Sequence, residues 1–183
     1  MAAHIHVSRW SLSAQGAVPW VTTIARLLLG GVLIAAGWLK IGTPALSVQA
    51  VKAYELLPGG AATAVGYGLP ILEIVFGALL VLGLLTRFSA VVAGLLMLAF
   101  VAGIASAWAR GLRIDCGCFG GDGTLAAGQE PAYLTELLRD AGLVLCAAWV
   151  AWFPPGRLAL DSLLGLSARP DDEEHDLDEE NDS

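Results

Sequence analysis

The chain has few charged residues and no cluster of basic ones. Only 15% of its 183 residues are charged, whereas 56% are hydrophobic, and this composition excludes a soluble globular domain. The lack of a basic cluster excludes nucleic-acid binding as a function class. The formal charge of −7 does not describe the fold, because nine of the 17 acids lie in residues 171–182. The rest of the chain is close to neutral and suffices for one compact helical bundle.

Cysteine and histidine are also scarce, with three of each. Cys116 and Cys118 are one residue apart, and no histidine lies near them. Two sulfurs at that spacing do not make a zinc site, so we expect no metal. Cys146 falls about 22 Å along the last predicted helix, too far to pair with the other two. We expect it to be a buried, inert, small apolar residue.

Long apolar runs dominate what remains. Four segments reach the length of about 20 residues that a membrane-spanning helix needs. They are Trp10–Leu39, Ala61–Leu85, Phe88–Ala109 and Ala132–Phe153. The fold class we predict is an all-α integral membrane protein, a four-transmembrane-helix bundle.

The segment between the first two spans, Thr43–Pro58, is too polar to cross a membrane. Thr43 can cap a helix and Pro44 suits its first turn. We therefore expect a short amphipathic helix lying in the membrane interface, ended by Pro58 and the two glycines after it. Tyr54 and Leu57 fall on its apolar face and would help to seal the cysteine loop.

The predicted organisation has three parts. Residues 1–17 form an N-terminal cytoplasmic segment, 18–155 the membrane domain, and 156–183 a C-terminal segment ending in a disordered acidic tail. Docking of the tail to a basic partner stays open. Four spans put both termini on one side, but basic residues divide equally between the two faces. We place the termini in the cytoplasm because a dithiol works as a disulfide only where cellular thiols do not keep it reduced.

The loop between the third and fourth spans is the candidate site. Its residues Asp115, Cys116, Gly117, Cys118, Phe119 and Gly120 are contiguous. A Cys-Gly-Cys disulfide closes a very small ring, and strained, exposed disulfides are the exchangeable ones. We expect the loop to give the thiols access to water, and its glycines would leave room for a partner's thiolate to approach. Two free thiols or a static staple are the alternatives.

Charged residues inside the spans are the second candidate feature. Glu73 lies near the middle of the second span, where a bare carboxylate is costly. We expect it to pair with Arg26, with Arg139 as the competitor, while Glu136 and Arg139 can satisfy each other at i,i+3. These ions either only hold the bundle together or line a polar pocket below the loop. Such a pocket could handle a proton or a quinone.

The sequence also resembles the MauE family of integral membrane proteins, which is grouped with the DoxX-like proteins, at motifs that include several of these residues. The resemblance covers about residues 20–155. Its marks are Tyr54-Glu-Leu-Leu-Pro58, Pro70-Ile-Leu-Glu73 leading to Gly77, Asp115-Cys-Gly-Cys-Phe-Gly-Gly121, and Leu138-Arg139-Asp140.

The resemblance implies a four-helix membrane protein tied to redox maturation of extracytoplasmic proteins, with a thioredoxin-fold partner. The architecture is also similar to four-helix disulfide-forming membrane proteins, which use Cys-x-x-Cys where this chain has Cys-x-Cys. We expect thiol–disulfide exchange through Cys116 and Cys118, in an order that the sequence does not assign. The rival hypothesis is an accessory subunit of a larger membrane complex, and the weakest is a small transporter that uses Glu73.

Overall fold

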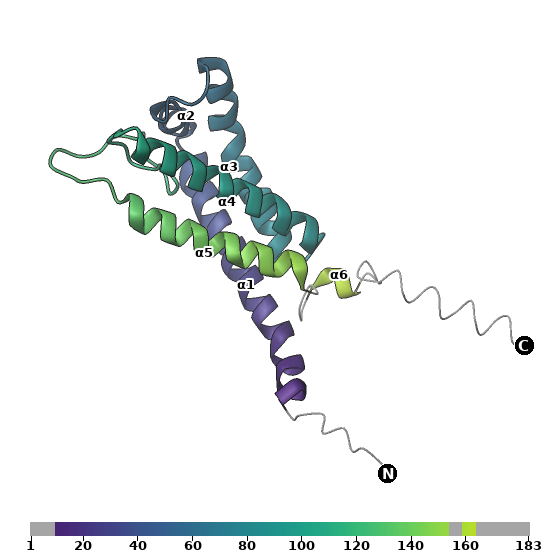
Figure 1. Ribbon diagram of the computed structural model, residues 1–183. Helices are drawn as coiled ribbons and strands as arrows, with labels where there is room; N and C mark the ends of the chain where they lie inside the picture. The colour runs from purple at the N-terminus through teal and green to yellow at the C-terminus, as the bar shows by residue number, and fades with distance from the viewer. Residues whose placement is uncertain (1–9, 154–158, 164–183) are drawn as a thin grey trace, which may run out of the picture.

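The computed structural model describes residues 10–153 and 159–163. This part of the chain is helical and contains no strand. Its six helices are α1 (Trp10–Ile41), α2 (Pro44–Ala53), α3 (Gly59–Leu82), α4 (Thr86–Ala109), α5 (Tyr133–Trp152) and α6 (Leu160–Leu163) (Figure 1). The predicted acidic tail and most of the predicted N-terminal segment lie outside the described residues.

In the part of the chain that the structure describes, three helices are long and apolar enough to cross a membrane. They are residues Val18–Ile41 of α1, all of α3 and all of α4. The prediction of a helical membrane protein is confirmed. Helix α5 has 20 residues, but Glu136, Arg139 and Asp140 lie in its first half, so its assignment as a fourth span stays a prediction.

Helices α1 and α3 run side by side in opposite directions and touch through glycines. A Cβ added at Gly30 would lie 2.8 Å from the carbonyl oxygen of Gly77, and one at Gly37 would lie 2.7 Å from that of Pro70. Small residues of this kind let membrane helices approach closely. This register sets Gly30 opposite Gly77 and Gly37 opposite Glu73, so the first turns of α3 extend beyond the end of α1.

Helix α2 is shorter than predicted. Pro44 occupies the first turn as expected, but Thr43 makes no side-chain capping hydrogen bond, and the helix ends at Ala53. Pro58 does not end it, because Pro58 is the N-cap of α3 and Gly59 is the first residue of that helix. Helix α2 packs on the projecting turns of α3, where a Cβ on Gly66 would lie 2.6 Å from the Cα of Val48. Its placement in a membrane interface stays a prediction.

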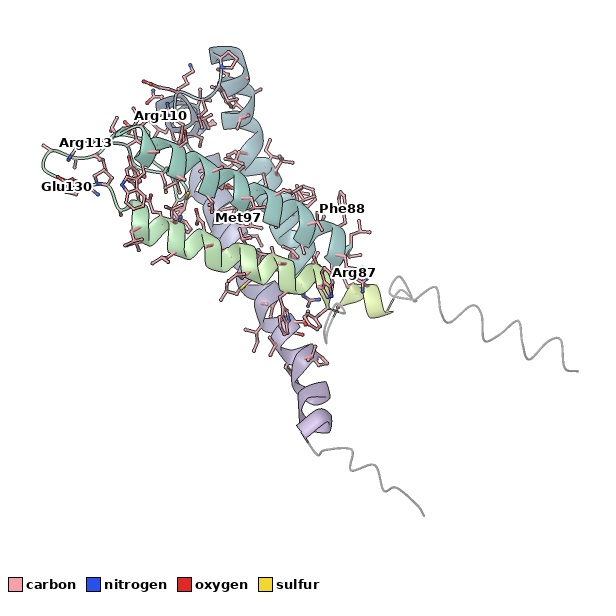
Figure 2. All side chains as sticks on the ribbon, in the orientation of Figure 1. Arg87, Phe88, Met97, Arg110, Arg113 and Glu130 are labelled. Atoms are coloured by element: carbon pink, nitrogen blue, oxygen red, sulfur yellow. The ribbon has the colours of Figure 1, made fainter. Side chains whose placement is uncertain are left out.

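The core has two parts. The larger cluster joins α1, α3, α4 and α5, with Leu33, Leu80, Met97 and Leu143 among its members. Figure 2 draws these side chains and labels Met97 on α4. The smaller lies at the end where α4 leads into the loop, and it contains both loop cysteines (Cys116 and Cys118 with Ile104, Ala107, Ile114 and Tyr133). The second cluster makes the cysteine loop part of the folded interior.

The opposite end of the bundle is closed by α6. The carboxylate of Asp161 accepts the backbone N–H groups of Leu85 and Thr86, each at 2.8 Å, where α4 begins. The Asp161 N–H donates to the carbonyl of Gly83 at 2.9 Å. Burial alone would raise the pKa of Asp161, but these hydrogen bonds and the charge of Arg26 hold it below its ordinary value.

Candidate functional site

The cysteine loop is folded against the bundle rather than open to solvent. Cys116 and Cys118 are 6% and 7% exposed, and both are free thiols in this structure. The prediction that the loop gives its thiols access to water is therefore wrong. Apolar neighbours from α4 and the following turn cover them, because the loop doubles back over that helix end.

The loop glycines explain this packing. Gly117 has φ +65°, and a Cβ there would lie 2.7 Å from the Cβ of Ala50 on α2. Gly123 has φ +83°, and a Cβ there would lie 2.9 Å from the Cβ of Ala53. Only glycine tolerates both the positive φ and the close approach. These two glycines bring the loop against α2, and do not hold a space open for a partner.

Side-chain hydrogen bonds fix the shape of the loop. The hydroxyl of Tyr54 donates to the carbonyl of Cys116 at 3.0 Å, so Tyr54 contacts the site as expected. The Gly117 N–H donates to Asp115 Oδ1 at 2.8 Å, which is an Asx turn. On the far side the Ile114 N–H donates to the Tyr133 hydroxyl at 3.0 Å. The cysteine backbone is therefore held from both α2 and α5.

Within this frame the two cysteines interact directly. The Cys118 backbone N–H donates to Cys116 Sγ at 3.4 Å. The Cys118 thiol also donates to Cys116, which lowers the pKa of Cys116 although burial opposes the shift. The same hydrogen bond, together with burial, raises the pKa of Cys118 far above its ordinary value. These directions make Cys116 the more acidic thiol of the pair.

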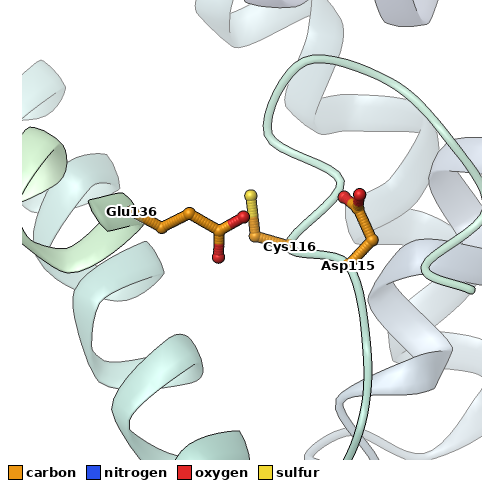
Figure 3. Close-up of side chains that lie close together, drawn as sticks. All are labelled: Asp115, Cys116 and Glu136. Carbon is orange, nitrogen blue, oxygen red and sulfur yellow. The ribbon is translucent and has the colours of Figure 1, made fainter. Parts of the chain in front are cut away.

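Helix α5 presents three charged side chains to this pair. Arg139 Nε donates to Asp140 Oδ1 at 2.8 Å, so Arg139 pairs with Asp140 and not with Glu136 as predicted. The Glu136 carboxylate points toward Cys116 Sγ (Figure 3). Among the described residues, Glu136 Oε2, Arg139 Nη2 and Asp140 Oδ2 are buried without a hydrogen-bond partner. Glu136 and Asp140 were not predicted as site residues.

The atoms around Cys116 include potential metal donors. Cys116 Sγ and carboxylate oxygens of Asp115 and Glu136 lie within 4.8 Å of one another. However, Asp115 Oδ1 already accepts a backbone N–H, and the Arg139 guanidinium interacts with Cys116. A cation at this point disfavours a second one. Arg139 therefore already supplies a positive charge beside Cys116, where a metal ion would bind.

The predicted partner of Glu73 is wrong. Lys40 Nζ, not Arg26, lies 2.6 Å from Glu73 Oε1, and the two side chains are 2% and 1% exposed. Arg26 is buried at the opposite end, beside Gly83 and facing Asp161. The predicted pairing fails because α3 projects beyond α1. This offset sets Glu73 level with the end of α1, where Lys40 lies, and away from Arg26.

A small cavity lies between Glu73 and Cys118. Its volume is about 20 Å³, enough for about one water molecule. Its lining includes Glu73, Cys118, Arg139 and Asp140, with Phe119 and aliphatic side chains completing the wall. The pocket expected below the loop is therefore present, but its size excludes a quinone ring in this conformation. Glu73 and Arg139 both line this cavity, whereas Arg26 does not.

The remaining predicted residues lie near the rim or elsewhere. The Phe119 ring is half-exposed and stacks with the Arg139 guanidinium, 4.8 Å from its centroid. Gly120 closes the turn, its N–H donating to the Gly117 carbonyl at 3.3 Å. Pro58 and Leu57 are exposed, so Leu57 does not seal the loop. Cys146 is half-buried in α5 rather than fully buried.

A bundle of apolar helices with a cysteine pair folded over one end defines a helical integral membrane protein with a dithiol site. The model of the family described as methylamine utilisation protein MauE matches residues 18–153. The chain therefore belongs to the MauE family, as the motifs predicted. Neither the curated proteins nor the solved structures include a match.

Proposed function

We propose that this protein supports thiol–disulfide exchange in the maturation of extracytoplasmic proteins, with Cys116 and Cys118 as the exchanging pair. One observation carries the proposal. Two free thiols are held in contact, with the Cys118 N–H on Cys116 Sγ at 3.4 Å. A low-pKa thiol beside a protonated one is the arrangement of exchange sites, because thiolate is the attacking species.

The same contact supports an order for the two cysteines. Cys116 is the nucleophile, since the hydrogen bond from Cys118 lowers its pKa. Cys118 is the resolving thiol, since it retains its proton until a mixed disulfide has formed on Cys116. In the reducing direction the dithiol gives two electrons to a partner disulfide, and the reverse reaction oxidises the partner.

The topology belongs to this proposal. Helix α5 is the fourth span, which puts both termini in the cytoplasm and the cysteine loop outside. A disulfide can persist there because glutathione and thioredoxin do not reduce it. The cavity beside Glu73 and Arg139 would supply protons to the site, and a quinone remains a candidate electron acceptor only if the bundle opens.

A thioredoxin-fold protein is the partner we propose. A groove of about 620 Å³ runs beside the loop and is lined by residues including Glu55, Arg113 and Thr124. Ile114 and Gly123 belong to its wall, and the Asp115 N–H bonds the Gly123 carbonyl at 3.1 Å. A chain seated there would lie next to the cysteine backbone. Access to the sulfurs requires the loop to move away from α2.

Burial of both thiols favours a second candidate function. A cysteine pair 6% and 7% exposed is equally suited to packing the interior of a non-catalytic accessory subunit. In that case α2 and the loop serve assembly of a larger membrane complex. The two functions differ in what happens when one cysteine is removed.

Trapping of a mixed disulfide separates them. In cells making Cys118→Ser protein, we expect a reducible covalent adduct on Cys116, because its resolving thiol is missing. Cys116→Ser should give no adduct, and Cys146→Ser, the matched control, should behave like the wild type. Adducts are detected on non-reducing gels and located by mass spectrometry. If Cys118→Ser gives no adduct and retains function, the accessory-subunit reading replaces exchange.

A further inference from the structure

One step of the proposed exchange needs a group that the cysteines do not supply. After Cys116 forms a mixed disulfide, Cys118 must lose its proton before its sulfur can attack. Cys118 is buried, and its thiol is strongly held in the protonated form. A thiol in such a place reacts slowly unless a nearby base takes its proton.

We propose that Asp140 is the general base for the resolving thiol and takes the Cys118 proton through the cavity that the two residues share. This inference rests on the proposed function. Asp140 is 2% exposed, and its Oδ2 is buried without a hydrogen-bond partner. Both residues line the cavity of about 20 Å³. A water molecule there would relay the proton from sulfur to carboxylate.

The surroundings of Asp140 suit this role. Arg139 Nε donates to Oδ1 at 2.8 Å, which leaves the second oxygen for the proton. From α3 the cavity faces Glu73, whose charge is balanced by Lys40 on α1. From one turn earlier on α5, Glu136 faces Cys116. Two carboxylates line the cavity with Cys118, and of these Glu73 is paired with Lys40. In the described part of the chain Asp140 has no lysine partner and is therefore the better proton acceptor.

Cys118 resolves the mixed disulfide by attacking the Cys116 sulfur. Cys118 gives its proton to Asp140, and its sulfur attacks Cys116 Sγ. The bond from Cys116 to the partner sulfur breaks, and the partner leaves as a thiolate. The product is a Cys116–Cys118 disulfide and a partner reduced by two electrons, with Asp140 protonated until the proton passes to water. In the reverse direction Asp140 returns the proton to Cys118.

Dipyridyl disulfide separates this step from the first one, because attack by Cys116 and resolution by Cys118 each release a coloured thiopyridone. The protein is the full chain in detergent, with Cys146→Ser to remove the third thiol. We expect Asp140→Asn to leave the first release unchanged and to slow the second by roughly a hundredfold. Glu130→Gln, which removes an exposed loop carboxylate (77% exposed), is the matched control and should change neither.

The wild-type pH profile provides a second test that needs no Asp140 variant. With an internal acceptor, the second release should be nearly constant between about pH 6.5 and 8.5. A rise of about tenfold per pH unit would mean that hydroxide removes the proton, and would overturn the role of Asp140. Equal second phases in Asp140→Asn and wild type would also overturn it. If no first release occurs in any variant with Cys116, the proposed function itself fails.

Discussion

The two ends of the bundle treat buried charge in opposite ways. At the α6 end, both oxygens of Asp161 accept backbone N–H groups at 2.8 Å, and Arg26 faces the same carboxylate. At the cysteine end, three carboxylate oxygens and one guanidinium nitrogen are buried without a hydrogen-bond partner in the described part of the chain: Glu73 Oε2, Glu136 Oε2, Asp140 Oδ2 and Arg139 Nη2. At the α6 end the Thr86 hydroxyl also lacks a partner among the described residues, but both carboxylate oxygens of Asp161 are engaged.

This difference distinguishes a buried charge that stabilises the fold from buried charges that are free to accept or donate a proton. A buried carboxylate whose two oxygens both accept backbone N–H groups stabilises the fold, and its protonation would weaken those hydrogen bonds. Unengaged polar atoms cost free energy, and natural proteins retain them where a ligand, a water or a proton is handled. The α6 end is therefore a structural clamp on α4. The cysteine end is where we propose that the chemistry takes place.

Breaking the Lys40–Glu73 pair should have the largest effect on stability. Lys40→Met leaves a buried carboxylate without its cation, which we expect to cost about 3–5 kcal/mol. Lys40→Met combined with Glu73→Gln should regain most of this loss, because no net charge then remains buried. Thermal unfolding in detergent measures both, with Lys52→Met on the exposed side of α2 as the control. An unchanged midpoint for Lys40→Met would show that the pair is not buried.

The clamp at the other end should give a smaller loss that depends on pH. Asp161→Asn weakens the charge-assisted hydrogen bonds to the start of α4, at a cost of about 1–3 kcal/mol. The folded pKa of Asp161 is lowered, so its contribution is complete above the unfolded value of about 3.9. It is lost as the pH falls through the folded value.

The measurement is the unfolding midpoint of both proteins at neutral and at acid pH. The stability difference between wild type and Asp161→Asn should shrink as the pH drops below about 4. The rates of thiol exchange should not differ between them at neutral pH. A difference that grows on acidification, or an exchange defect without destabilisation, would contradict the division between the two ends.

The smallest effect on stability is expected for the loop anchor. Tyr54→Phe removes one hydrogen bond, to the Cys116 carbonyl, and should cost about 0.5–1.5 kcal/mol. Since this bond holds the loop on the bundle, Cys116 should become several-fold faster to alkylate. Tyr67→Phe, on the exposed side of α3, is the control. Slower alkylation, or no change, would mean that loop opening does not limit access to the thiols.

The apolar runs were sufficient to predict the spanning helices. Their length and lack of charge determine α1, α3 and α4 within a few residues, because a bilayer imposes both. The short helix after Pro44 was also predictable from its proline and its polarity. Its early end at Ala53 was not, because residues 54–57 instead leave the helix and bring Tyr54 to the cysteines.

The pairing of charges could not be predicted, because it depends on how far one helix slides along another. The contact of Gly37 with Pro70 sets Glu73 level with the end of α1, and no periodicity within either helix encodes that offset. The cysteines themselves were evident from the sequence, but their burial depends on the contacts of Gly117 and Gly123 with α2. Asp140 did leave a signal, being four residues after Glu136 on the same helical face.

Reversible formation of the Cys116–Cys118 disulfide is the direct test of thiol–disulfide exchange at the loop. The full chain in lipid nanodiscs is equilibrated with glutathione at increasing oxidised fractions, quenched by alkylation and analysed by mass spectrometry of the loop peptide. We expect one intramolecular disulfide that forms and is reduced over the same range of glutathione ratios while the protein stays folded. Thiols that remain reduced in the folded protein under oxidising conditions, and oxidise only after unfolding, would contradict the account.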